Sequence, residues 1–132
     1  MPYTRTVRID MPHSEAIEVV RKAFADQGFG VITEIDMSAT LEAKIGAQME
    51  PYVILGACNP QLAHRAVQVD SSIGALLPCN VVVRTEGGET IVDALDPAVM
   101  SQMSDDPALG EVAEEAGRRI DAALQTLRDQ SA

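Results

Sequence analysis

The chain has 132 residues with an apolar fraction of 46%, a length that suits one folded domain and a composition that excludes a disordered chain. Twenty acidic residues stand against ten basic ones, so the formal charge of −10 disfavours nucleic acid and anionic membranes as partners. No apolar run reaches the roughly 20 residues of a membrane span, and the first residues do not resemble a signal peptide, so we expect a soluble cytoplasmic protein.

The first third of the chain predicts a strand, a helix and a second strand. Residues 3–9 alternate in polarity, which is typical of a strand with one buried face. The segment that follows Pro12 has apolar residues at helical spacing and predicts an amphipathic helix that ends at Gly28. Residues 30–36 predict the second strand. Aromatic residues make up only 3% of the chain, so the core should be aliphatic.

A short helix is expected next. Leu41 and Ile45 lie four residues apart and would share one face of this helix. Either Ser38 or Thr40 is a suitable N-cap residue. The helix should stop at Gly46, because glycine commonly terminates helices.

Residues 52–58 are almost entirely apolar, which predicts a central strand that is covered on both faces. Asn59 and Pro60 then supply an N-cap and a first helical residue, so a short helix should follow. Residues 79–84 predict the next strand, which should form a hairpin with the strand that follows Gly87 and Gly88.

The C-terminal part predicts a short turn of helix followed by a long helix that begins near Pro107 and covers the sheet. Its apolar residues form one stripe: Leu109, Val112, Ala113, Ala116, Ile120, Ala123, Leu124 and Leu127. We find no linker or repeat, so residues 1–132 should form a single domain.

The two cysteines, Cys58 and Cys79, are the strongest candidates for chemistry. If the strands that contain them pair antiparallel, the end of one lies beside the start of the other, and we expect both thiols on the same face of the sheet. Cys58 directly precedes a predicted helix start, which favours a thiolate. The alternative is that both cysteines are buried and act as small hydrophobic residues.

Three polar residues near the cysteines complete the candidate site. Asn59 and Asn80 each follow a cysteine, and His64 lies in the helix after Cys58. His64 with the two thiols would supply three metal ligands or a nucleophile and its base. The paired spacings of structural zinc sites are absent, however, and the carboxylates are scattered. We therefore assign no catalytic residue, metal or cofactor, and we regard His13 as an unrelated surface residue.

The chain resembles the domain of unknown function 302 family. The resemblance is carried by residues 51–60 (PYVILGACNP) and 74–83 (GALLPCNVVV), with support from the Gly-Phe-Gly turn at residues 28–30 and from Asp96-Pro97. It implies an α+β fold of the TATA-box-binding-protein type, with a curved antiparallel sheet and helices on one face, and a homodimer. It implies no established activity, and a fold shared with a DNA-binding protein does not imply DNA binding.

These observations lead to three hypotheses for function. The first is a dimeric small-ligand-binding or accessory protein, not an enzyme, with an apolar site around the two Cys-Asn pairs that would suit a small organic ligand. The second is a thiol-based redox protein or sensor in which Cys58 attacks and Cys79 resolves. The third is a protein whose cysteines only pack the core and which acts through protein–protein contacts.

Overall fold

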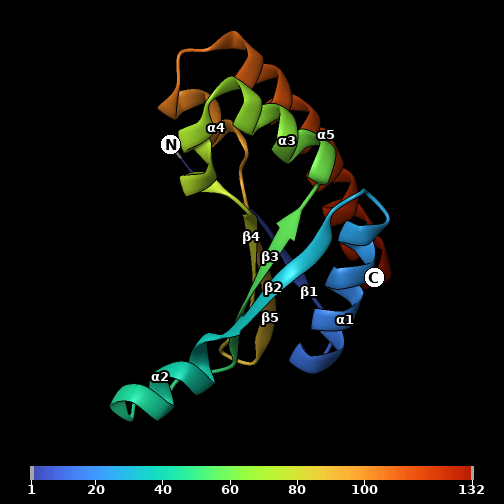
Figure 1. The fold of residues 1–132 in the computed structure, drawn as a ribbon. Helices are drawn as coiled ribbons and strands as arrows, with labels where there is room; N and C mark the ends of the chain where they lie inside the picture. Colours follow the sequence, from blue (N-terminus) through green and yellow to red (C-terminus); the bar gives the residue numbers. More distant parts are fainter. Residues whose placement is uncertain (1, 132) are drawn as a thin grey trace.

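The computed structural model describes residues 2–131 of the chain as an α+β fold (Figure 1). Its elements are, in chain order, β1 (Thr4–Ile9), α1 (His13–Ala25), β2 (Gly30–Asp36), α2 (Met37–Ile45), β3 (Tyr52–Cys58), α3 (Pro60–Val69), the 3-10 helix η1 (Ser71–Leu76), β4 (Cys79–Glu86), β5 (Glu89–Leu95), α4 (Ala98–Met103) and α5 (Pro107–Ser131). The predicted order of strands and helices is confirmed, and η1 is an addition to it.

The strands form one antiparallel sheet of five strands in the order β1-β5-β4-β3-β2. The predicted hairpin between β4 and β5 is present, and Gly87 and Gly88 close it with φ angles of 58° and 83°. These left-handed conformations are open to glycine without a steric penalty. The predicted antiparallel pairing of β3 with β4 is also confirmed, which brings the two cysteine-bearing strand ends together.

Helices α1 and α5 cover one face of the sheet, and α3 packs beside α5 (Figure 1). The core between these layers is aliphatic, as the composition predicts, apart from Phe24 and Phe29, whose ring centroids are 6.1 Å apart in an edge-to-face arrangement. Every residue of the predicted apolar stripe of α5 is buried. The long helix therefore covers the sheet as expected.

One arginine fixes α5 to the edge of the sheet. The Arg5 guanidinium on β1 donates to the Gly117 carbonyl at 2.9 Å and pairs with Asp96 at 3.1 Å and Asp121 at 2.9 Å. A Cβ at position 117 would lie 3.1 Å from an Arg5 nitrogen, so glycine in the middle of α5 makes room for this contact. The favourable charges of Asp96 and Asp121 outweigh desolvation and raise the pKa of Arg5.

No helix packs across the other face of the sheet in the described residues (Figure 1). Tyr52 and Ile54 of β3 point to this outer face and are only partly buried, so the expectation that β3 is covered on both faces is wrong. Gly56 is buried there because Thr33 and Pro78 lie over it. Neighbouring side chains, rather than a second layer of helices, give this strand its apolar environment.

Helix α2 stands apart from the rest of the molecule and has no buried residue (Figure 1). It ends at Gly46 as predicted, but the predicted N-cap was wrong. The cap is Asp36, whose Oδ1 accepts a hydrogen bond from the Ala39 amide at 2.9 Å and another from the Ser38 hydroxyl at 2.8 Å. These two bonds lower the pKa of Asp36.

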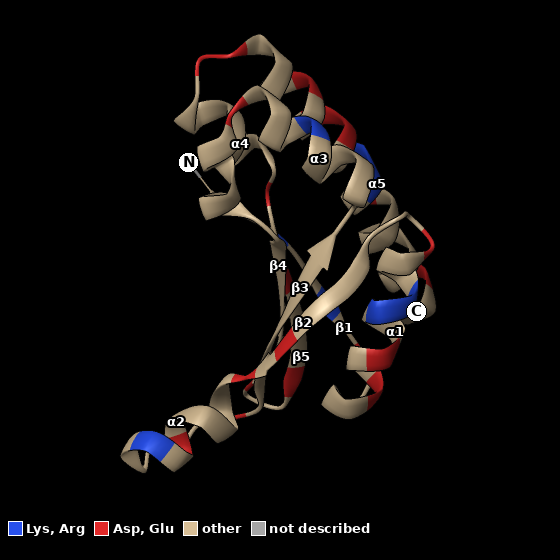
Figure 2. Cartoon of the chain, in the orientation of Figure 1, with Lys and Arg blue, Asp and Glu red and all other residues tan. Residues whose placement is uncertain are grey.

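Acidic and basic residues both occur along α1 and α5, and basic residues form no concentrated patch in the described part of the chain (Figure 2). A protein that binds nucleic acid through its backbone usually presents such a patch. Within residues 2–131, no helix combines the length and the apolar character needed to cross a membrane.

Candidate functional site

The register between β3 and β4 corrects the predicted placement of the two cysteines. Cys79 lies opposite Ala57, and Cys58 is the next residue along β3. Because side chains alternate across a strand, Cys79 shares the helix-covered face with Ala57, whereas Cys58 has the parity of the outer face. The expectation that both thiols share one face was therefore wrong by one residue.

The two cysteines nevertheless line the same cavity, at the end of the sheet beneath α3 and α5. Its volume is about 30 Å³, and its walls are apolar except for the cysteines and Asn59. Among the other residues that line it are Ala57, Leu62, Leu77, Pro78, Met100 and Val112. This volume is far below the roughly 300–1,000 Å³ of a typical site for a drug-sized ligand, so the cavity suits only a very small molecule or an ion.

The thiols differ in exposure and in protonation. Cys58 is half-buried, Cys79 is buried, and neither forms a disulfide. Burial, with a smaller contribution from the nearby Cys58, raises the pKa of Cys79 to about 11. Cys79 is therefore a protonated thiol at neutral pH, and Cys58 is the more accessible of the two.

Asn59 is part of this site, but Asn80 and His64 are not. Asn59 is buried and caps α3, because its Oδ1 accepts a hydrogen bond from the Leu62 amide at 3.0 Å. Asn80 is exposed and lies opposite Gly56 on the outer face of the sheet. His64 is exposed on α3 and does not line the cavity. The described residues contain no group of three His, Cys, Asp or Glu that could hold a metal ion.

Met100 is the residue of this site that sequence reasoning missed. It lies on the short helix α4, is 3% exposed, and lines the cavity with both cysteines. Its position in the sequence gave no signal, because only the packing of α4 on α5 brings it to the strand ends. Three sulfur-containing side chains, from β3, β4 and α4, thus meet at one small cavity.

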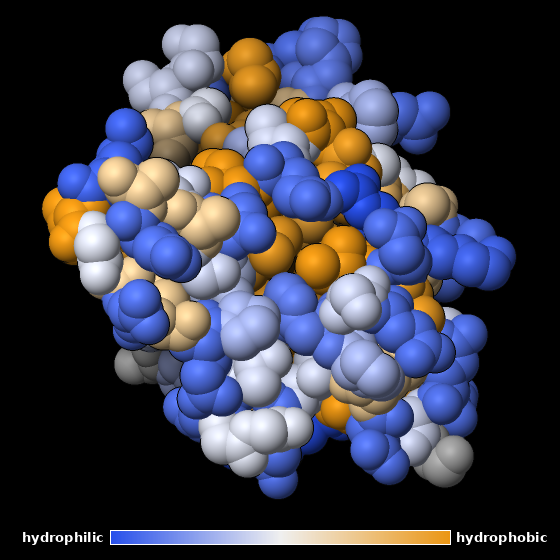
Figure 3. All heavy atoms as spheres, turned by 90° about the horizontal axis from the view of Figure 1, so that it is seen from below, coloured by the Kyte–Doolittle hydropathy of each residue, from blue (hydrophilic) through white to orange (hydrophobic). Residues whose placement is uncertain are grey.

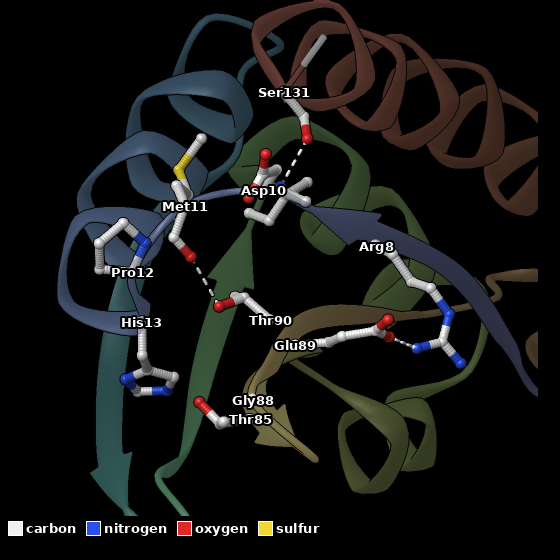
Figure 4. A pocket seen from close by; sticks show the side chains of 11 residues that line it. Arg8, Asp10, Met11, Pro12, His13, Thr85, Gly88, Glu89, Thr90 and Ser131 are labelled. Atoms are coloured by element: carbon white, nitrogen blue, oxygen red, sulfur yellow. Dashed lines mark hydrogen bonds and ion pairs between the residues drawn. The ribbon is translucent and has the colours of Figure 1, made fainter.

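A second, larger hollow lies at the opposite end of the sheet, where β1 ends and α1 begins (Figure 4). Its volume is about 700 Å³, and polar side chains dominate its rim. The Thr90 hydroxyl donates to the Met11 carbonyl at 2.7 Å, and Arg8 pairs with Glu89. These polar groups form a hydrogen bond and an ion pair within the protein. This arrangement favours a role in holding the Met11–Pro12 turn against β5.

His13 borders this hollow and also a neighbouring groove of about 370 Å³ between α1 and α2. Its Nε2 lies 2.8 Å from the Val83 carbonyl, which can only accept, so Nε2 carries the proton. His13 is partly buried and bonded to the sheet, and the expectation of an unrelated surface residue understated its structural role.

Viewed from the end at which α2 lies, apolar side chains gather in the middle of the molecule and are surrounded by hydrophilic ones (Figure 3).

Comparison with solved structures identifies a near neighbour of this fold. The crystal structure of an uncharacterized conserved DUF302 protein from Bacillus stearothermophilus matches with a TM-score of 0.89 and 33% sequence identity. The match covers 96% of this chain and 99% of that chain. Among curated proteins, none matches the chain.

The family model for the domain of unknown function DUF302 matches residues 4–127, which include every strand and all but the end of α5. The motifs around Cys58 and Cys79 that carried the resemblance in the sequence lie within this range and form the strand ends at the cavity. The chain belongs to the DUF302 family.

Proposed function

We propose that this protein is a homodimeric binding module that holds a very small ligand in the cavity beside Cys58 and Cys79. The observation that carries the proposal is the convergence of both cysteines, from two different strands, on one apolar cavity. Cysteines that only pack the core need not line a common cavity, because a buried thiol packs like any small hydrophobic side chain. The half-buried Cys58 offers a route to the cavity from solvent.

The volume of the cavity restricts the size of the ligand that the site could hold. A site for a drug-sized organic molecule usually measures about 300–1,000 Å³. The cavity at the cysteines measures about 30 Å³, so the organic ligand suggested by the sequence does not fit there in this conformation. The ligand of this site is therefore a single ion or a molecule of a few atoms.

The dimer is supported by residues 30–50, here called the β2–α2 arm. No residue of this arm is buried, although it contains the apolar Ile32, Ile35, Leu41, Ile45 and Met49. A nine-residue helix such as α2 is only marginally stable in water without tertiary contacts. The arm and the uncovered sheet face together supply the residues of an ordinary interface, which takes about 20–30 from each partner. A two-fold contact between two copies would cover both surfaces at once.

The dimer is tested by sedimentation equilibrium of the wild type and of the variant Ile45→Asp. Ile45 is 75% exposed, so an aspartate there should leave the fold intact and weaken association at least about tenfold. The matched control is Val67→Asp, which changes a 40% exposed residue of α3 that is remote from the arm. A wild type that is monomeric at all concentrations contradicts the dimer.

The binding site is tested by alkylation of the reduced, folded protein with iodoacetamide, followed by mass mapping of each cysteine. We expect Cys58 to react and Cys79 to stay largely unmodified at neutral pH, because Cys79 is both buried and protonated. We also expect the free energy of unfolding of Cys58→Ala to lie within about 1 kcal/mol of the wild-type value. Two inert thiols together with a strongly destabilised Cys58→Ala variant would mean that the cysteines only pack the core.

The redox hypothesis remains the second candidate, because two free thiols border one cavity. In that reaction an external oxidant such as diamide takes two electrons and both thiol protons are released as the Cys58–Cys79 bond forms. Intact mass after diamide treatment distinguishes the candidates. A disulfide that forms readily and is reversed by a dithiol supports the redox role, whereas two thiols that persist in diamide contradict it.

A further inference from the structure

We propose that Cys58, Cys79 and Met100 form a site for a soft metal ion and that the ion is Cu(I), an inference that rests on the proposed binding role of the same cavity. It specifies the chemical class of the ligand. The three side chains come from the end of β3, the start of β4 and α4, and all three line one cavity.

The dimensions of the cavity fit an ion. A volume of about 30 Å³ is small, and an ion bound among the three side chains needs no more space than this. Cys79 is 7% exposed and Met100 is 3% exposed, so water has little access to two of the three sulfur groups. Cys58 is half-buried, so it is the most accessible of the three side chains.

The donor set selects for a soft ion. Thiolate and thioether sulfur are the ligands that Cu(I) prefers, and two thiolates with one thioether provide a three-coordinate arrangement. Zinc in a structural site takes four ligands, and no further thiol, imidazole or carboxylate lines the cavity. Asn59 does line it, but its side-chain oxygen already accepts a hydrogen bond from the Leu62 amide. Calcium and magnesium need several oxygen ligands, which this site lacks.

Charge and proton balance are compatible with a cation. The chain carries a net charge of −10, which attracts cations at long range. Each cysteine that binds as a thiol, Cys58 as well as Cys79, exchanges its S–H bond for a metal–sulfur bond and releases its proton to solvent, with no change in the oxidation state of the metal.

The experiment is an anaerobic titration of the reduced full chain with Cu(I) in competition with bicinchoninate, followed by the absorbance of the bicinchoninate complex. We expect one Cu(I) per chain. The variants Cys58→Ser and Cys79→Ser should each lose at least about a hundredfold in affinity, because each removes a thiolate ligand. Zn(II) offered in place of Cu(I) should bind far more weakly.

Met100→Leu is the decisive variant, because it preserves side-chain volume and removes only the thioether sulfur. Its matched control is Met103→Leu on the same helix, where the side chain is 68% exposed and outside the cavity. We expect about a tenfold loss of Cu(I) affinity for Met100→Leu, a wild-type affinity for Met103→Leu, and wild-type circular dichroism for both.

The metal site is overturned if the wild type binds Cu(I) no better than the double variant Cys58→Ser/Cys79→Ser, or if Met100→Leu and Met103→Leu bind equally well. Neither result decides the proposed function, which is judged by the alkylation of Cys58. If Cys58 is reactive but the protein does not bind Cu(I), the cavity is still a small-ligand site, and its ligand is a different one. An inert Cys58 with no Cu(I) binding would remove both proposals.

Discussion

At the scale of single residues, Gly56 shows how closely the outer face of the sheet is packed beside the cysteines. Thr33 and Pro78 lie where a side chain at position 56 would project. Pro78 is also part of the cavity wall and directly precedes Cys79. Because Gly56 has no side chain, Pro78 can lie over it, and this contact helps to hold the segment that positions Cys79.

We predict that Gly56→Ala lowers the free energy of unfolding by about 2–3 kcal/mol, because the new Cβ would overpack this site. It would lie 2.8 Å from the Pro78 Cγ, and the proline ring cannot rotate away. Urea denaturation measures the effect. The control is Gly30→Ala on the neighbouring strand, where a Cβ would meet no atom within 4 Å. Equal stability of the two alanine variants would show that the Pro78 segment yields easily.

At the scale of elements, α2 depends on local interactions because none of its residues is buried. Asp36 ends β2 and caps α2, and its carboxylate accepts two hydrogen bonds. The cap is the main contact that starts the helix, since α2 has no buried residue. The stability of α2 should therefore respond to a change at this one side chain.

We predict that Asp36→Ala increases amide exchange across α2 and costs about 1 kcal/mol of local helix stability. Asp36→Asn should retain most of the cap. The folded-state pKa of Asp36 is lowered, so the capping contribution is present above its unfolded pKa and is lost as the pH falls through the lowered value. Hydrogen-exchange protection factors of α2, taken relative to the unstructured rate at each pH, measure this loss. Protection factors in the wild type that do not fall on acidification would contradict it.

At the scale of the whole molecule, the net charge of −10 opposes the association of two copies. The apolar residues of the β2–α2 arm favour association, and their contribution does not depend on charge. The balance between these two terms would give the proposed dimer a characteristic response to salt. Salt screens the repulsion, because the Debye length falls to about 10 Å at 0.1 M.

We predict that the dimer tightens several-fold when the ionic strength rises from about 0.02 M to 0.15 M. Sedimentation equilibrium of the wild type at the two ionic strengths measures the change. The variant Ile45→Asp should stay weakly associated at both. A wild-type dimer that weakens as salt is added would instead indicate an interface held by ion pairs.

The sequence determined the local structure because its signals act over a few residues. The alternation in residues 3–9, the Asn59-Pro60 helix start, the Gly87-Gly88 turn and the stripe of α5 each predicted an element that the fold contains. Helical and strand periodicity depends only on neighbouring residues, so these assignments needed no knowledge of packing. The general position of the candidate site, at the joined ends of β3 and β4, was also predicted.

Only the tertiary structure decided the composition of that site. A shift of one residue in strand register places Cys79 rather than Cys58 on the helix-covered face, and sequence alone does not fix a register. Met100 joins the cavity through the packing of α4, whereas His64 and Asn80 turn away from it. The volume of the cavity and the missing burial of the β2–α2 arm likewise depend on long-range contacts. Local sequence patterns do not reveal such contacts, because the contacts form between residues that are far apart in the chain.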